Sequence, residues 1–225
     1  MRPFDEIFAL AAERKGGADA LEALLPVPAD PEMLRAIPDD RWLSIFSRGV
    51  FQAGFNWTVV ETKWPDFEEV FQGFAVDRLA GMDDETLEGH LKDTRIIRNA
   101  AKVRSIRDNA MMLRDLAAER GEPGHGARTI VDWPKAEFAG VLAMLGRRGS
   151  RLGGTTGMYA LRAMAVDGWV ISRDGLAALQ RDGVLDGPAT SKRAQAAIQA
   201  AFNSWAEQSG RPFMQISRVL ATSIG

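Results

Sequence analysis

Apolar residues recur at intervals of three and four along most of the chain, which is the spacing of one buried face of an α-helix. The clearest example is the segment 40–53, whose apolar stripe includes Trp42, Phe46 and Val50. Strict alternation of apolar and polar residues, which is typical of a half-buried strand, persists nowhere beyond a few residues, and 129–133 is the best candidate. The pattern therefore predicts an all-α fold built from many short helices.

Glycines, prolines and capping residues set the expected ends of these helices. Asp39 or Asp40 is expected to cap the helix with the stripe just described, and Pro65 is expected to separate two later helices. Asn99 is expected to cap a long helix that ends at Gly121. The other expected helices cover residues 4–14, 18–25, 83–93, 134–146, 156–166, 173–181, 190–208 and 212–220.

Composition is that of an ordinary globular protein and narrows the possible chemistry. The chain has 225 residues, a formal net charge of −2, two histidines and no cysteine. Disulfides, thiolate metal sites and a cysteine nucleophile are therefore excluded, and we expect neither a metal site nor a cofactor. Because there is no apolar run long enough to cross a bilayer and no signal peptide, we expect a cytoplasmic protein without membrane contact.

The stretch FQAGFNW, residues 51–57, interrupts an apolar segment with a glycine flanked by amides. An aromatic stripe usually belongs to a core, but a core needs no amide at Gln52 or Asn56. A pocket for a flat, polar ligand uses both rings and amides. This stretch therefore predicts the wall of such a pocket.

A basic corner follows at DTRIIRNAAKV, residues 93–103, where one expected helix ends and another begins. Backbone N–H groups at a helix N-terminus attract anions, and Arg95, Arg98 and Lys102 add positive charge beside them. This arrangement suits a duplex phosphate. The alternative is an ordinary corner whose basic side chains are solvated.

The glycine-rich segment GGTTG, residues 153–157, has the composition of a phosphate-binding loop. It lacks the spacing Gly-x-x-x-x-Gly-Lys, so a nucleotide triphosphate loop is rejected. Thr155 or Thr156 is expected either to cap the next helix or to contact a nucleic-acid backbone.

Together these stretches resemble the DNA-3-methyladenine glycosylase I family of helix-hairpin-helix repair glycosylases. The matching residues in SRGVFQAGFNW are Gln52, Ala53, Gly54 and Trp57, and DFEEVFQGF (66–74) matches the family's phenylalanine segment. The hairpin matches at Asp93, Ile96, Ile97, Arg98, Lys102 and Val103, and a later Gly-Thr-Thr-x-x-Tyr motif matches at Gly154, Thr155, Thr156 and Tyr159. The matches keep the family's order from about residue 42 to 165, so their joint agreement is more specific than any single motif.

The resemblance implies a multi-helix DNA glycosylase-like fold with a helix-hairpin-helix element, organised as a single domain over residues 1–225. Residues 39–182 are the expected family-like core, 1–38 are divergent N-terminal helices, and 183–225 are a C-terminal helical extension. Two departures stand out. Gly49 occupies the position of the family's pocket glutamate, and the family's Cys/His zinc site has no counterpart.

By resemblance, the protein flips an alkylated purine out of damaged double-stranded DNA into an aromatic pocket and hydrolyses its N-glycosidic bond. The expected base pocket consists of Gly49, Phe51, Gln52, Phe55, Asn56, Trp57 and Tyr159. The expected contacts to the DNA backbone are Arg95, Arg98, Asn99, Lys102, Thr155 and Thr156. Glu61 is the candidate carboxylate for the space that Gly49 leaves beside Trp57, because it lies one helical turn after the indole; a solvent-exposed Glu61 is the alternative.

Two other functions remain open at the level of sequence. The first is a non-catalytic protein that binds damaged DNA and has lost excision together with the pocket glutamate. The second is a helical interaction domain that binds no nucleic acid, against which the retained Trp57 and the basic corner argue. The sequence gives no indication of the oligomeric state or of which modified base is bound.

Overall fold

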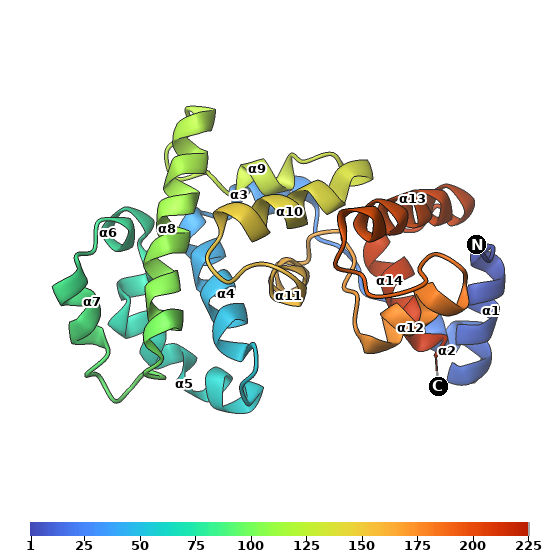
Figure 1. Ribbon diagram of the computed structural model, residues 1–225, viewed down its shortest axis with the longest axis horizontal. Coiled ribbons are helices and arrows are strands. Elements are labelled where there is room, and N and C mark those ends of the chain that lie inside the picture. Colours follow the sequence, from blue (N-terminus) through green and yellow to red (C-terminus); the bar gives the residue numbers. More distant parts are fainter. Residues whose placement is uncertain (225) are drawn as a thin grey trace. The chain divides into compact units, whose positions relative to one another are not determined.

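The computed structural model describes residues 1–224, and the regular structure of this part of the chain is entirely helical (Figure 1). It contains fourteen α-helices and two short 3₁₀ helices, and no strand occurs among the described residues. The all-α prediction is therefore confirmed. None of the described helices combines the length and apolarity needed to cross a membrane.

The chain forms two compact units, each assembled from separate stretches of sequence. Unit 1 consists of residues 1–29, 134–140 and 165–225, and unit 2 of residues 30–133 and 141–164. The expected boundaries at 38/39 and 182/183 stay a prediction about the family-like core, since the compact units divide the chain at other positions.

Unit 2 is built around the long helix α8, which packs against α4, α6 and α7, while α4 also packs against α5 and α11. Its helices are α3 (Pro31–Ala36), α4 (Asp39–Gln52), α5 (Trp57–Val70), η1 (Gln72–Phe74), α6 (Val76–Ala80), α7 (Asp84–His90), α8 (Ala100–Arg120), α9 (Arg128–Val131) and α11 (Thr155–Ala163). Most of α10 (Phe138–Arg148) also belongs to this unit. The capping of α8 agrees with the sequence, since Asn99 Oδ1 accepts from the Lys102 N–H at 3.1 Å and Gly121 ends the helix with φ +67°.

Pro65 does not separate two helices, because α5 continues through it from Trp57 to Val70. A proline inside a helix removes one backbone hydrogen bond and usually bends or breaks the helix. Here Trp64 and Phe67, on either side of the proline, stack on each other with ring centroids 4.9 Å apart. Phe51 packs edge-on against Phe67 at 4.7 Å. This aromatic packing stabilises helical geometry across the proline.

The start of α4 also differs from the sequence-based expectation. Pro38 occupies the N-cap position, and neither Asp39 nor Asp40 caps the helix. The buried Asp39 carboxylate instead accepts from the Gly126 and Ala127 N–H groups at 2.7 and 2.9 Å. Burial raises the pKa of Asp39, and these two hydrogen bonds oppose that rise. Asp39 thus fastens α4 to the loop before α9.

A second buried anchor holds the glycine-rich segment that precedes α11. The fully buried Asn109 donates to the Ser150 carbonyl at 3.1 Å and accepts from the Ser150 N–H at 2.7 Å. Farther along, a Cβ at Gly157 would lie 2.3 Å from the Leu152 carbonyl oxygen, so only glycine fits there. Asn109 and Gly157 together fix where α11 begins.

Unit 1 joins the two ends of the sequence around an aromatic core. Its helices are α1 (Phe4–Lys15), α2 (Ala18–Glu22), η2 (Lys135–Glu137), α12 (Arg173–Arg181), α13 (Lys192–Ser209) and α14 (Phe213–Thr222). Trp169, Phe202 and Phe213 form a cluster with centroid distances of 4.8 to 5.6 Å. The buried Trp205 donates its indole N–H to the Arg2 carbonyl at 3.0 Å. The C-terminal helices therefore complete a core with the N-terminal ones.

Candidate functional site

Unit 2 contains a cavity of about 370 Å³ between α4, the first turns of α5, and α11. Two aromatic rings meet at its edge, the Trp57 indole and the Tyr159 phenol ring, with centroids 5.8 Å apart and ring planes at 87°. They are 51% and 39% exposed, which is unusual for large rings in a molecule whose core holds most of its tryptophans. The cavity is lined by Ile45, Arg48, Gly49, Gln52, Trp57, Glu61, Tyr159, Ala160, Arg162 and Ala163.

One wall of the cavity carries a carboxylate held by two side chains of α4. Glu61 Oε1 accepts from Gln52 Nε2 at 2.6 Å, and Glu61 Oε2 pairs with Arg48 Nη1 at 3.2 Å. The Glu61 side chain remains 48% exposed. An acceptor group beside two π-faces suits a flat ligand that carries positive charge and N–H donors.

Gly49 lies on the cavity wall, but the space that its missing side chain was expected to leave is partly filled. A Cβ at this position would lie 3.4 Å from the Ala160 Cβ and 3.8 Å from the Thr156 carbonyl oxygen. The glycine allows α4 and α11 to approach closely. A Cβ at this position would therefore already be in van der Waals contact with α11.

The turn at residues 51–57 contributes fewer cavity residues than the sequence suggested. Gln52 and Trp57 line the cavity, whereas Phe51, Phe55 and Asn56 do not. Phe51 is fully buried in the aromatic core, and Phe55 is 46% exposed at the tip of the turn. Asn56 caps α5, because its Oδ1 accepts from the Thr58 N–H at 2.9 Å. The amide at position 56 is thus explained by helix capping.

Arg95, expected to contact DNA, is engaged by acidic groups of the protein. Its guanidinium pairs with Asp93 at 2.8 Å and with Glu69 at 2.7 Å. Hydrogen bonds from Arg95 lower the pKa of Asp93 to about 2, and the two carboxylates raise the pKa of Arg95. Lys63 Nζ donates to the Arg95 carbonyl at 2.7 Å. These contacts fix the turn before α8.

Three more of the residues expected at the DNA backbone have different surroundings. Asn99 caps α8 with its side chain. Lys102 Nζ donates to the carbonyls of Phe51 and Ala53 at 3.0 and 2.8 Å, and burial lowers the pKa of Lys102. Arg98 is exposed, and no ion pair involves it among residues 1–224. Of this set, Arg98 is the cation that stays free for an anionic ligand.

Thr155 and Thr156 begin α11, but neither side chain caps it. Gly154 is the N-cap residue and has φ +61°, a conformation that favours glycine. Thr155 is exposed and Thr156 is half-buried. The cap predicted for these threonines is therefore wrong, and the contact of Thr155 and Thr156 with a nucleic-acid backbone stays a prediction.

Sequence reasoning missed several cavity residues. Arg48 lies one turn before Gln52 on α4, and Arg162 lies one turn after Tyr159 on α11, so helical spacing alone could have found both. Ala160 and Ala163 carry no chemical signal of their own. They line the cavity because α4 and α11 pack closely together, and this packing cannot be predicted from the residues of either helix alone.

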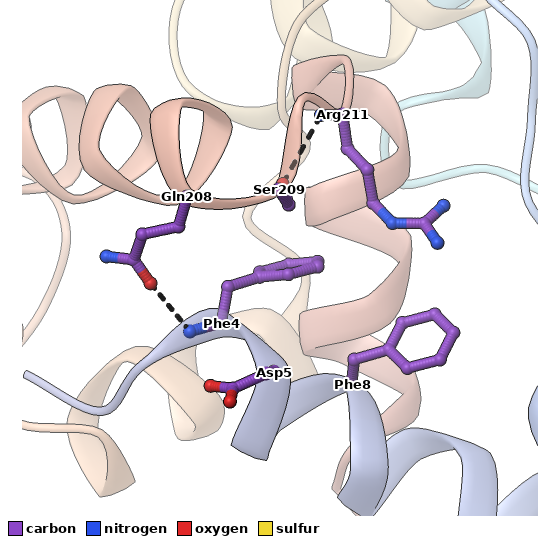
Figure 2. A pocket seen from close by; sticks show the side chains of 6 residues that line it. All are labelled: Phe4, Asp5, Phe8, Gln208, Ser209 and Arg211. Atoms are coloured by element: carbon purple, nitrogen blue, oxygen red, sulfur yellow. Dashed lines mark hydrogen bonds between the residues drawn. The ribbon is translucent and has the colours of Figure 1, made fainter.

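A second cavity, of about 500 Å³, lies in unit 1 between α1 and the junction of α13 with α14 (Figure 2). Polar groups that line this cavity form hydrogen bonds or ion pairs with other residues of unit 1. Gln208 Oε1 accepts from the Phe4 N–H at 2.9 Å, and Ser209 Oγ accepts from the Arg211 N–H at 3.3 Å. The Arg211 guanidinium pairs with Glu22 and lies over the Phe8 ring at 4.9 Å.

Within the described residues, no group of acidic or histidine side chains is placed to hold a metal ion.

A match to a family model agrees with the resemblance found in the sequence. Residues 38–133 match the model of the methyladenine glycosylase family. A crystal structure of 3-methyladenine DNA glycosylase I is 24% identical, with a TM-score of 0.48 over 63% of this chain and 82% of that one. A tyrosine-to-phenylalanine variant of 3-methyladenine DNA glycosylase I, crystallised in complex with 3-methyladenine, is 17% identical, with a TM-score of 0.48 over 56% and 76% of the two chains. No curated protein matches the chain.

Proposed function

Because residues 38–133 match the model of the methyladenine glycosylase family, we propose that this protein is a DNA glycosylase that removes an alkylated purine from double-stranded DNA. The observation that carries the proposal is the cavity of unit 2, where the exposed Trp57 and Tyr159 rings stand beside the Glu61 carboxylate. Its volume of about 370 Å³ falls in the range of small-ligand pockets. A flipped purine is a ligand of this kind.

The aromatic pair supplies the attraction for a damaged base. Alkylation at N3 of adenine leaves a positively charged ring, and the indole face of Trp57 attracts it with about 0.5–2 kcal/mol. Glu61 accepts hydrogen bonds from the exocyclic amine of the base and adds charge complementarity. Gln52 and Arg48 orient that carboxylate, which is the role their hydrogen bonds to it support.

Chemistry at the sugar requires little from the protein. A cationic purine is already a good leaving group, so no strong general acid is needed. The site contributes recognition, exclusion of bulk water and placement of one water molecule near the sugar carbon. No lysine lines the cavity within the described chain, so the proposal includes hydrolysis alone and no Schiff-base step.

The duplex is held by the N-terminus of α8 and by the exposed side chains near the cavity. Arg98 and Thr155 contact phosphate, and the amides at the first turn of α8 add the positive end of its helix dipole. Phe55, exposed at the tip of its turn, stacks against the neighbouring bases when the target leaves the helix. Phe55 thus contacts the bases that remain in the duplex, and Trp57 contacts the extruded base.

The proposal is tested by measuring free bases released from methylated duplex DNA by liquid chromatography. We expect the wild-type protein to release 3-methyladenine and the Trp57→Ala variant to release it about 2- to 30-fold more slowly, the loss that removal of a cation–π contact of about 0.5–2 kcal/mol predicts. Tight binding to abasic or damaged DNA with no release from the wild-type protein would favour the non-catalytic alternative. Gly49, which stands where the family has a glutamate, is the specific observation behind that alternative.

A further inference from the structure

The side chain of Lys102 connects the first turn of α8 to the last residues of α4. Its ammonium donates to the Phe51 carbonyl at 3.0 Å and to the Ala53 carbonyl at 2.8 Å. The last carbonyls of a helix have no partner within the helix and carry the negative end of its dipole. A lysine that reaches them from another helix acts as a C-terminal cap.

The Lys102 side chain also lies close to the rings of Phe51 and Phe55, in the turn that leads to Trp57. Lys102 Nζ lies 5.9 Å from the centroids of both the Phe51 and Phe55 rings. Within the turn, the Phe55 N–H donates to the Gln52 carbonyl at 3.1 Å, and Gly54 adopts φ +69°. Trp57 then begins α5. The direction in which α5 starts therefore depends on where the carbonyls of residues 51 and 53 are held.

We infer that Lys102 is a positioning residue, which holds the 51–57 turn against α8 so that Trp57 stays at the cavity edge, and that it makes no contact with DNA phosphate. This inference rests on the proposed function for its consequence in catalysis. Its structural part concerns the turn alone and can be tested without any reaction.

The structure distinguishes this role from a phosphate contact. Two of the three N–H donors of Lys102 are used by backbone carbonyls, and the side chain is partly buried. Arg98, four residues earlier and just before the N-cap of α8, is exposed and supplies positive charge to the same corner. Burial and the nearby Arg151 both lower the pKa of Lys102, which is the environment of an internal hydrogen-bond donor.

The first experiment measures hydrogen–deuterium exchange of peptides that cover residues 51–60. Lys102→Met keeps the aliphatic stem and removes the donors, and Lys92→Met is the matched control, because Lys92 is exposed on the same stretch. We expect exchange in the 51–60 peptides to rise at least about 10-fold in Lys102→Met, as loss of a local hydrogen-bonded cap predicts, and to stay unchanged in Lys92→Met. Lys102→Arg keeps a donor and is expected to restore most of the protection. Unchanged exchange in Lys102→Met would overturn the inference.

The second experiment separates positioning from phosphate binding. Each phosphate contact contributes about 0.9 to the slope of log affinity against log salt concentration. We expect Lys102→Met to leave that slope unchanged while single-turnover base release falls roughly 10- to 100-fold, the scale of a small misplacement. Arg98→Met should reduce the slope by about one. A slope reduced by this amount in Lys102→Met would overturn the inference and return Lys102 to the DNA contacts.

The two proposals fail in different ways. If the wild-type protein releases no base, the proposed glycosylase is wrong, and the exchange measurement still decides the role of Lys102. If base release is present and the 51–60 peptides are equally protected in wild type and Lys102→Met, the positioning role is wrong and the glycosylase stands.

Discussion

The two cavities of this molecule differ in how far their aromatic side chains are exposed to solvent. In unit 1 the rings and polar groups around the cavity are paired with one another, as Arg211 is with Phe8 and Glu22. In unit 2 the rings of Trp57 and Tyr159 are exposed, although apolar surface of this kind gains free energy when it is buried. The exposure of these two rings, more than the volume of the cavity, is the observation behind the proposed base pocket.

The comparison is tested most strongly by one substitution made in both units. Trp205→Ala, in the core of unit 1, should lower the free energy of unfolding by about 3–5 kcal/mol, because the indole is fully buried. Trp57→Ala should change it by less than about 0.5 kcal/mol. Urea unfolding of both variants measures this difference. Equal losses of stability would mean that Trp57 is a core residue.

Glu61→Gln sharpens the comparison within unit 2, since it keeps the shape of the side chain and removes its charge. We expect base release to fall about 10-fold, because a charge-assisted hydrogen bond is roughly twice as strong as a neutral one. Affinity for undamaged duplex DNA should not change. Asp5→Asn, at the cavity of unit 1, is the matched control and should leave base release unaltered. Loss of activity in both variants would remove the distinction between the cavities.

Substitutions of Gly49 test whether the wall of the unit 2 cavity can accommodate the glutamate side chain of the family pattern. Gly49→Ala should be tolerated within about 1 kcal/mol, because its Cβ would be in ordinary contact with Ala160. Gly49→Glu should reduce base release several-fold, since the longer chain must pass Ala160 and places a second carboxylate near Glu61. Melting temperature and base release, measured on the same preparations, separate the two effects. Faster release in Gly49→Glu would contradict this prediction.

The smallest expected effect concerns the corner before α8. The pKa of Asp93 is lowered to about 2 by Arg95, so the pair is intact above the unfolded pKa of about 4 and is lost as pH falls through about 2. Unfolding midpoints of wild type and Asp93→Asn should therefore converge between about pH 4 and pH 2. Because both side chains reach solvent, the difference at neutral pH should be small. Parallel pH curves would show that the pair does not stabilise the fold.

Local patterns were enough to predict much of the fold. The periodic stripe of α4 and the Asn99 cap of α8 depend on residues within a few positions of each other, and both agree with the structure in their main features. Pro65 misled the prediction, because the stacking of Trp64 on Phe67 stabilises the helix through it. The division into two units was also not predictable from local patterns, since unit 1 joins segments that lie far apart in the sequence.

In the candidate site, too, the features that depend on neighbouring residues were easier to predict than those that depend on distant segments. Gln52, Trp57 and Glu61 are neighbours in sequence, and helical spacing suggested that Glu61 could face the cavity. The charge of Lys102 led to the prediction of a phosphate contact, but the sequence gives no sign of the Phe51 and Ala53 carbonyls that Lys102 binds, because they belong to a distant segment. Close approach of two backbones, as at Gly49 and Ala160, is equally invisible before the fold is known.

The joining of early and late segments in unit 1 has a consequence for synthesis on the ribosome. Residues 30–164 contain every segment of unit 2, so the cavity can assemble while α13 and α14 are still being translated. The apolar face of α1 is not covered at that stage, because α1 packs against α13 and α14. Residues 1–29 of the nascent chain should therefore expose apolar surface until α14 has been synthesised. A chain truncated before α13 should be bound by chaperones at these residues.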